Sequence, residues 1–156
     1  MAILAVGTGI AEAQAPAASL ETAAAEGVIR VRSAYPFDET VNRIKAAVRA
    51  NKILLLGEID QSKLAAGAKI KLRPSKLLLF GNPPLGVQLL TANPYAGLDW
   101  PVRMLVVQDA DGKVWAAYTD FDFIAQRYNI VDRSAVVAMA IKVSALIAGS
   151  ALAPSP

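Results

Sequence analysis

A short apolar run between two proline-bearing segments constrains the fold of this chain most strongly. Residues 77–80 are Leu-Leu-Leu-Phe with no polar alternation, which is typical of a strand covered on both faces. Pro74 lies before the run, and Gly-Asn-Pro-Pro at residues 81–84 ends it abruptly. Asn82 is a good N-cap, and prolines suit the first positions of a helix. The stretch therefore predicts a buried strand that leads through a tight turn into a helix.

The rest of the chain divides into further strand and helix patterns. Strand patterns cover residues 28–32, 52–60, 102–108 and 113–119, and Gly57 indicates either a bulge or a close backbone approach in the second of them. Helix patterns cover residues 36–50, 61–68, 120–128 and 134–148. Residues 109–112 form a hairpin loop, in which Gly112 suits a left-handed conformation. A chain of 156 residues with these elements predicts one domain, over residues 28–149.

The first 27 residues resemble an export signal followed by a flexible leader. An apolar stretch, residues 2–11, precedes Ala11-Glu12-Ala13, a pair of small residues that signal peptidase recognises, with cleavage expected after Ala13. No Lys or Arg precedes the stretch, so the signal is incomplete unless the true start lies upstream of Met1. We expect a periplasmic or secreted protein, with a cytoplasmic one as the alternative, and a flexible tail over residues 150–156.

The composition excludes several kinds of chemistry. The chain has no cysteine and no histidine, which excludes disulfides, thiolate catalysis, the usual zinc ligand and the usual general base. The net charge of +3 comes with scattered basic residues that are not interleaved with aromatic ones, so no nucleic-acid partner is expected. The last helix pattern is shorter than the ~20 residues of a membrane span. The residues indicate no metal site and no identifiable cofactor.

The strand-to-helix turn carries the first candidate site. Backbone N–H groups at a helix N-terminus favour an anion, here at Gly81 and Asn82, with Arg73 and Lys76 close by in sequence. These residues predict a non-catalytic site for a small anionic ligand. The alternative is that the turn is only structural.

Two carboxylates suggest an enzyme as the second hypothesis. Glu58 and Asp60 fall on one face of their strand, two positions apart. Either could act as a general base, with Tyr118 or Lys76 as the acid and Arg73 holding a substrate anion. The alternative for Asp60 is to cap the helix that follows it.

The last helix suggests a third hypothesis, because it is apolar almost all round. Its side chains, including Val137, Ile141 and Leu146, predict burial against the sheet or against another molecule. The third hypothesis is therefore a homodimer, or a module that docks on a partner protein, through this helix.

A series of motifs resembles the DUF302 family, a domain of unknown function. The motifs are Pro-Phe-Asp-Glu-Thr-Val at 36–41, Glu-Ile-Asp at 58–60, Leu-Arg-Pro-Ser at 72–75, Phe-Gly-Asn-Pro at 80–83, Gly-Leu-Asp-Trp-Pro at 97–101, Asp-Gly-Lys-Val-Trp at 111–115 and Tyr118. The resemblance implies an α+β fold, a mostly antiparallel sheet of about four to five strands with helices packed on one side. It brings no established activity. Relatives often carry histidine where this chain has Gln61 and Tyr128, so chemistry based on those imidazoles does not transfer.

Overall fold

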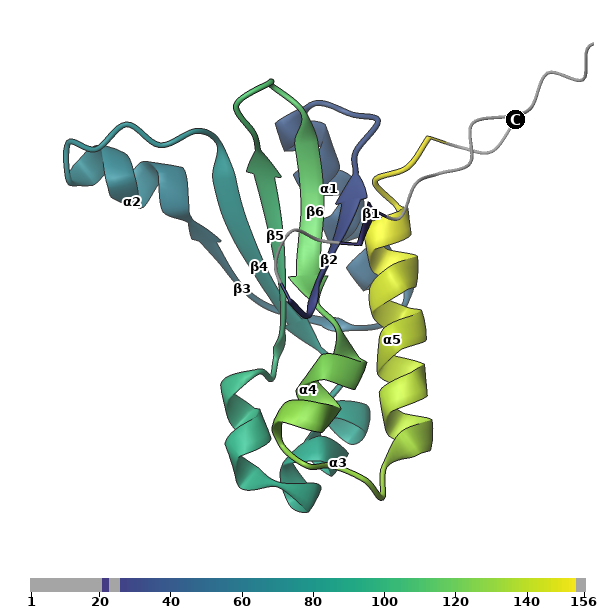
Figure 1. Ribbon diagram of the computed structural model, residues 1–156. Coiled ribbons are helices and arrows are strands. Elements are labelled where there is room, and N and C mark those ends of the chain that lie inside the picture. The colour runs from purple at the N-terminus through teal and green to yellow at the C-terminus, as the bar shows by residue number, and fades with distance from the viewer. Residues whose placement is uncertain (1–20, 23–25, 154–156) are drawn as a thin grey trace, which may run out of the picture.

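The computed structural model describes residues 21–22 and 26–153, and shows one antiparallel sheet with helices around it (Figure 1). The strand order is β1-β2-β6-β5-β4-β3, and each neighbouring pair is antiparallel. The bounds are β1 Glu21–Thr22, β2 Val28–Arg32, β3 Leu54–Asp60, β4 Ser75–Gly81, β5 Val102–Gln108 and β6 Val114–Thr119. Five strands of ordinary length and the two-residue β1 therefore form the sheet.

The helices follow the predicted segments closely. Their bounds are α1 Phe37–Ala50, α2 Gln61–Gly67, α3 Pro83–Ala92, the 3-10 helix η1 Pro94–Leu98, α4 Phe121–Arg127 and α5 Ser134–Gly149. Together with the antiparallel sheet, they confirm the α+β fold that the sequence predicts. Two local predictions are also confirmed: the register of β3 shifts between Leu55 and Gly57, and Gly112 has a φ of +79° in the β5–β6 loop.

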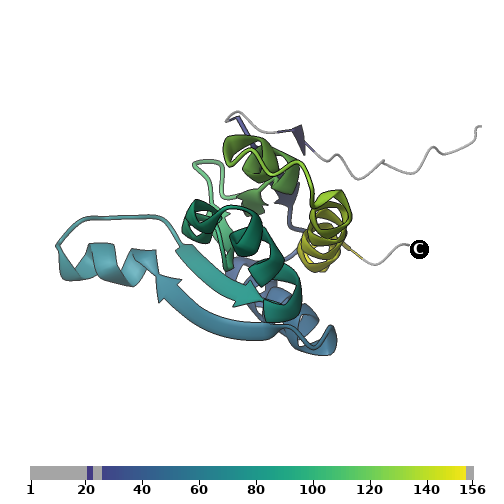
Figure 2. The same cartoon turned by 90° about the horizontal axis from the view of Figure 1, so that it is seen from below.

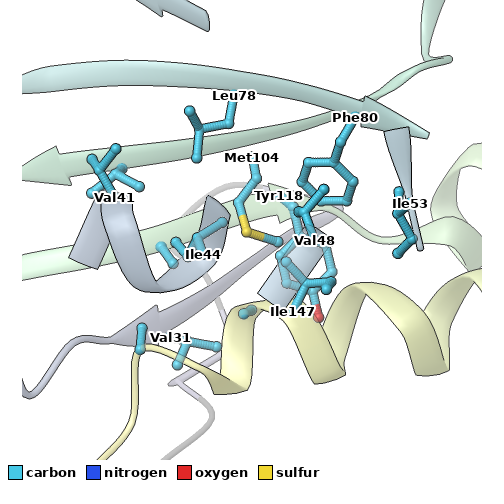
Figure 3. Close-up of a cluster of buried hydrophobic side chains, with 14 of the residues drawn as sticks. Val31, Val41, Ile44, Val48, Ile53, Leu78, Phe80, Met104, Tyr118 and Ile147 are labelled. Atoms are coloured by element: carbon cyan, nitrogen blue, oxygen red, sulfur yellow. The ribbon is translucent and has the colours of Figure 1, made fainter. Parts of the chain in front are cut away.

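The main core lies between one face of the sheet and two helices. Side chains alternate along each strand, so Leu78 and Phe80 of β4 share this face with Met104 and Val106 of β5. They pack against α1 and α5 through the side chains labelled in Figure 3, which include Val41, Ile44, Val48 and Ile147. Strand and helix residues of this core are almost completely buried.

The opposite face of β4 corrects one prediction. Leu77 and Leu79 point away from α1 and α5 and are only partly buried, whereas Leu78 has no exposed surface. The prediction of a strand covered on both faces is therefore wrong. An antiparallel sheet can carry helices on one face alone, and a four-residue run does not distinguish the two cases.

A second, smaller core lies at one end of the sheet. There α3, η1 and α4 group around the first half of α5 (Figure 1). Its buried side chains are Leu89, Ala96, Phe121, Ile124, Tyr128, Ile130, Val136, Val137 and Ala140. The end of β4 and the start of β5 lie where the two cores meet.

At the other end of the sheet, β3, α2 and β4 form a projecting arm (Figures 1 and 2). Asp60 caps α2 by accepting a hydrogen bond from Lys63 N at 2.8 Å. The helix itself contributes no buried residue. This arm, from β3 to β4, extends away from the helices that surround the rest of the sheet.

The predicted export signal lies outside the described residues. Within the predicted leader, Glu21 and Thr22 form β1 and pair with Arg30 and Ile29 of β2. Among the residues that the structure describes, every helix is too short or too polar to span a bilayer.

Candidate functional site

The two halves of the predicted anion site lie at opposite ends of β4. Arg73 and Lys76 are at its start, and Gly81 and Asn82 are at its end. A strand of seven residues spans about 20 Å. The structure does not bring the two pairs of residues together.

The first turn of α3 also offers an anion no free backbone donor. The first two residues of α3 are prolines and have no N–H. The next two amides, Leu85 N and Gly86 N, both donate to the carbonyl oxygen of Asn82, at 3.0 and 2.8 Å. The first four residues of α3 therefore present no free backbone N–H to an anion, which removes part of the support for the anion hypothesis.

An ion-pair network surrounds Glu58. Its carboxylate accepts from Lys45 Nζ of α1 at 2.6 Å and lies 3.0 Å from Lys76 Nζ of β4. Lys76 also lies 3.8 Å from Asp60. Hydrogen bonds from Lys45 and Lys76 lower the pKa of Glu58, and the bond to Glu58 raises the pKa of Lys76. The charge of Lys76 is thus neutralised locally, while Arg73 is exposed and has no polar partner in the described chain.

This network predicts a pH-dependent contribution to stability. Because the pKa of Glu58 is lower in the folded protein than its ordinary value of 4.5, the contribution is present above that pH and is lost as the pH falls. Glu58→Gln is expected to lower the free energy of unfolding at pH 7 by about 1 kcal/mol or less, and to have a smaller effect at pH 3. Urea denaturation at both pH values measures this. Glu39→Gln, which removes an exposed pair with Arg43, is the control and should show a smaller loss at pH 7.

Of the two predicted acids, Lys76 lies beside Glu58 and Asp60, whereas Tyr118 does not. Glu58, Leu78, Met104 and Tyr118 form one row across four neighbouring strands. Three strand spacings place Tyr118 about 14 Å from Glu58, with the fully buried Leu78 and Met104 between them. Tyr118 itself lies in the core, where burial raises its pKa. Of the two roles predicted for Asp60, general base and helix cap, the structure shows the cap of α2.

A small cavity lies beside Gly81 and Asn82, where the two cores meet. The volume that the centre of a water-sized sphere can occupy inside it is about 30 Å³. The lining is almost entirely apolar and comprises Ile53, Phe80, Gly81, Asn82, Leu85, Gly86, Leu89, Trp100, Val102, Phe121, Ala140, Val143 and Ser144. Asn82 is exposed and Phe80 is buried, so the cavity runs from the surface at the turn into the interior.

Two polar groups of this cavity have no partner within the described part of the chain. Ser144 is 1% exposed, and its Oγ has no hydrogen bond. Asn82 begins α3 but makes no side-chain cap bond. Ser144 was missed by the sequence analysis. The signal available for it was a polar residue in an apolar helix, on the side that also carries Ala140 and Ile147.

A buried carboxylate was also missed. The side chain of Asp99 is 4% exposed and accepts hydrogen bonds from Tyr128 Oη at 2.6 Å and from Arg127 Nη1 at 3.3 Å. Arg103 donates a third, short hydrogen bond to it. This cluster joins η1, β5 and α4, so its geometry indicates a role in holding these elements together.

Comparison with protein families identifies the chain. A family model described as "Domain of unknown function DUF302" matches residues 29–148. This chain belongs to the DUF302 family. The DUF302 fold is also seen in the crystal structure of an uncharacterised conserved DUF302 protein from Bacillus stearothermophilus, with a TM-score of 0.73 at 16% identity. The superposition covers 81% of this chain and 99% of that one.

Two curated relatives of this chain are longer proteins that it matches over part of their length. Both are named fluoride-specific ion channel FluC 1, from Brucella suis biovar 1 and Brucella abortus biovar 1, and each is 33% identical over 104 residues. The match covers 67% of this chain but 41% and 38% of the two relatives. The chain thus spans about two fifths of the length of these relatives.

The positions where DUF302 relatives often carry histidine do not share a site here. Gln61 accepts a hydrogen bond from Ser75 Oγ at 2.7 Å, at the start of β4. Tyr128 donates a hydrogen bond to Asp99. Asp99 lies near Val102 of β5, the residue that pairs with Phe80 at the opposite end of β4. Both side chains take part in local hydrogen bonds, and neither residue lines the cavity.

The apolar last helix is divided between buried and exposed positions. Val137 is buried in the second core and Ile141 packs against it, whereas Met139 and Leu146 are about half exposed. The helix therefore finds most of its partners within the domain. A dimer through α5 stays a prediction.

Proposed function

We propose that this DUF302 domain is a non-catalytic binding domain whose ligand places a slender apolar part in the cavity beside Gly81 and Asn82. The hydroxyl of Ser144 carries this proposal, because it is buried in an apolar cavity and has no partner in the described chain. A buried polar group without a hydrogen bond destabilises a fold by about 1–3 kcal/mol. A ligand with a hydrogen-bonding group at its inner end would remove this penalty.

The dimensions of the cavity limit the ligand. Its 30 Å³ would hold about two ordered water molecules. Only the polar end and the first carbons of a straight chain therefore fit inside without rearrangement, with the rest of the chain at the mouth, and a ring system or a branched chain does not fit. The exposed side chain of Asn82 at the mouth can bond a second polar group of the ligand. An uncharged molecule with a short straight chain matches this lining better than an anion, since the basic residues first considered for an anion lie at the other end of β4.

Binding of 1-hexanol tests the proposal. A ligand of seven non-hydrogen atoms is expected to bind with a dissociation constant on the order of 1 mM. At about ten times that concentration it should stabilise the fold by about 1.4 kcal/mol. Thermal unfolding measures this gain, and Trp100 fluorescence in a Trp115→Phe background reports directly on the cavity wall.

Two variants of Ser144 separate ligand binding from non-specific effects of an alcohol. Ser144→Val fills the space and removes the unpaired hydroxyl, so the protein should be more stable by about 1 kcal/mol and should no longer bind 1-hexanol. Ser144→Ala keeps the space, and should weaken 1-hexanol about three- to tenfold while leaving the binding of 1-chlorohexane unchanged. Equal stabilisation of the wild type and Ser144→Val by 1-hexanol would refute the cavity as the binding site.

An enzyme is the weaker alternative. It required Glu58 or Asp60 as the base, Tyr118 or Lys76 as the acid, and Arg73 to hold a substrate anion. Lys76 lies beside both carboxylates, but its bond to Glu58 raises its pKa, which makes it a poorer acid. Asp60 caps α2, and the core separates Tyr118 from Glu58. The curated relatives are named fluoride channels, but this chain matches only part of them. Channel activity is therefore not part of the proposal.

Export is a separate part of the proposal. Its support is the sequence pattern of residues 2–13, which lies outside the described residues. Mass spectrometry of the protein recovered from intact cells should give a mature N-terminus at Gln14. A full-length chain in the cytoplasmic fraction would favour the cytoplasmic alternative.

A further inference from the structure

The tip of the projecting arm combines exposed apolar and exposed basic side chains. We define the arm tip as residues 63–73, which includes most of α2 and the segment that returns to β4. Its apolar side chains are unusually exposed: Leu64 at 65%, Ile70 at 62% and Leu72 at 48%. Four exposed basic residues lie among them, Lys63, Lys69, Lys71 and Arg73. No acidic residue occurs between positions 61 and 75.

The core of the domain does not account for these apolar side chains. No residue of α2 is buried. The helix is held by its Asp60 cap, by hydrogen bonds between its first two residues and Ser75 of β4, and by backbone bonds at its end, such as Ile70 N to the carbonyl of Ala65 at 2.8 Å. Residues 69–73 alternate basic and apolar side chains, and they lie outside any helix or strand. A cluster of exposed apolar side chains on a monomer indicates a surface that another molecule covers.

We propose that the arm tip docks on a lipid bilayer whose surface carries anionic headgroups. The basic side chains neutralise headgroup charge, and Leu64, Ile70 and Leu72 insert into the boundary between headgroups and acyl chains. Figures 1 and 2 show α2 at the far end of the arm, away from the helices of the domain. The tip can therefore reach a flat surface while the cavity, at the other end of β4, remains open to solvent.

The chemistry of the arm tip favours lipid over nucleic acid. Proteins that bind single strands place aromatic side chains between the basic residues, on which bases stack. The side chains between the basic residues here are aliphatic, and the arm tip contains no aromatic residue. Aliphatic side chains suit an acyl boundary, where burial of apolar surface contributes to binding together with charge.

Vesicle sedimentation with the full chain tests the proposal. The protein is mixed with vesicles of phosphatidylcholine alone, or of phosphatidylcholine with 30 mol% phosphatidylglycerol as the anionic lipid. We expect binding to the anionic vesicles that weakens at high salt, and little binding to phosphatidylcholine. Lys69→Gln/Lys71→Gln should weaken binding more than tenfold, since each basic residue near an anionic surface contributes about fivefold. Ile70→Ser/Leu72→Ser should also weaken it about tenfold or more.

Matched variants elsewhere on the surface serve as controls. Lys52→Gln/Lys142→Gln removes the same charge from exposed positions outside the arm, and Val131→Ser removes an apolar side chain that is 81% exposed. These variants should bind vesicles about as well as the wild type. All of the substituted side chains are exposed, so melting temperatures should remain close to that of the wild type.

Three results would overturn the proposal. These are no binding to anionic vesicles, equal binding to both kinds of vesicle, and equal loss of binding in the arm and control variants. A random-sequence oligonucleotide bound through the arm, with no binding to vesicles, would instead assign the basic residues to nucleic acid.

Discussion

Replacing Gly86 by alanine is expected to lower the free energy of unfolding by about 3 kcal/mol, because a side chain at this position has no room. A Cβ on Gly86 would lie 1.7 Å from Nε1 and 2.4 Å from Cδ1 of Trp100. On its other side the indole is limited by Gly81, where a Cβ would lie 3.2 Å from Cζ2. Trp100 would have to leave its place against α3, and the neighbouring cavity is too small to accept an indole ring.

Thermal unfolding measures this effect, and the expected decrease in Tm is about 10 °C for a domain of this size. Gly149→Ala is the matched control, since Gly149 also lies in a helix and a Cβ there meets nothing within 4 Å. That variant should be as stable as the wild type or more stable by up to about 1 kcal/mol. Similar losses in both variants would show that helix geometry, and not the contact with Trp100, requires the glycine.

Asp99→Ala is expected to destabilise the protein by about 3 kcal/mol. The carboxylate of Asp99 is buried and accepts hydrogen bonds from Tyr128, Arg127 and Arg103. Its removal leaves the buried Tyr128 hydroxyl without this acceptor and separates α4 from η1. The two arginine side chains are about half exposed, so water can solvate them and the loss remains below that of a fully buried pair.

Urea denaturation of three variants tests this interpretation. Tyr128→Phe removes one of the three hydrogen bonds and should cost about 1 kcal/mol. Asp99→Asn keeps the shape but removes the charge, and should fall between the other two. A negligible effect of Asp99→Ala would show that the cluster does not hold η1 and α4 together.

The same cluster predicts a change in the titration of Tyr128. Its hydrogen bond to Asp99 is the main cause that raises the pKa of Tyr128. The folded protein thus holds this proton more tightly than the unfolded chain, so the stabilising contribution is present below the ordinary tyrosine pKa and is lost as the pH rises above it. In Asp99→Asn the tyrosinate absorbance should develop at lower pH than in the wild type.

The cavity and the arm tip lie at opposite ends of β4, and each was only partly visible in the sequence. The turn at residues 81–84 marked the mouth of the cavity, but its apolar walls come from segments as distant as Ile53 and Ser144. The basic residues near Arg73 were noticed, but as neighbours of that turn. Their exposure beside Ile70 and Leu72 becomes evident only when the arm is seen to project from the domain.

The sequence by itself determined the features that depend on neighbouring residues. These include the helix at residues 37–50, the Asp60 cap, the bulge at Gly57 and the left-handed Gly112 in its hairpin. Each follows from spacing or conformational preference within a few positions. The family motifs added the α+β architecture.

Only the tertiary structure decided which of these features come together. The length of β4 separates Arg73 from Asn82, although nine positions in sequence suggested proximity. Strand register places Leu78 and Met104 between Glu58 and Tyr118. Burial leaves Ser144 Oγ without a partner and gathers three donors around Asp99. Such contacts depend on the packing of distant segments, and local residue patterns carry no information about that packing.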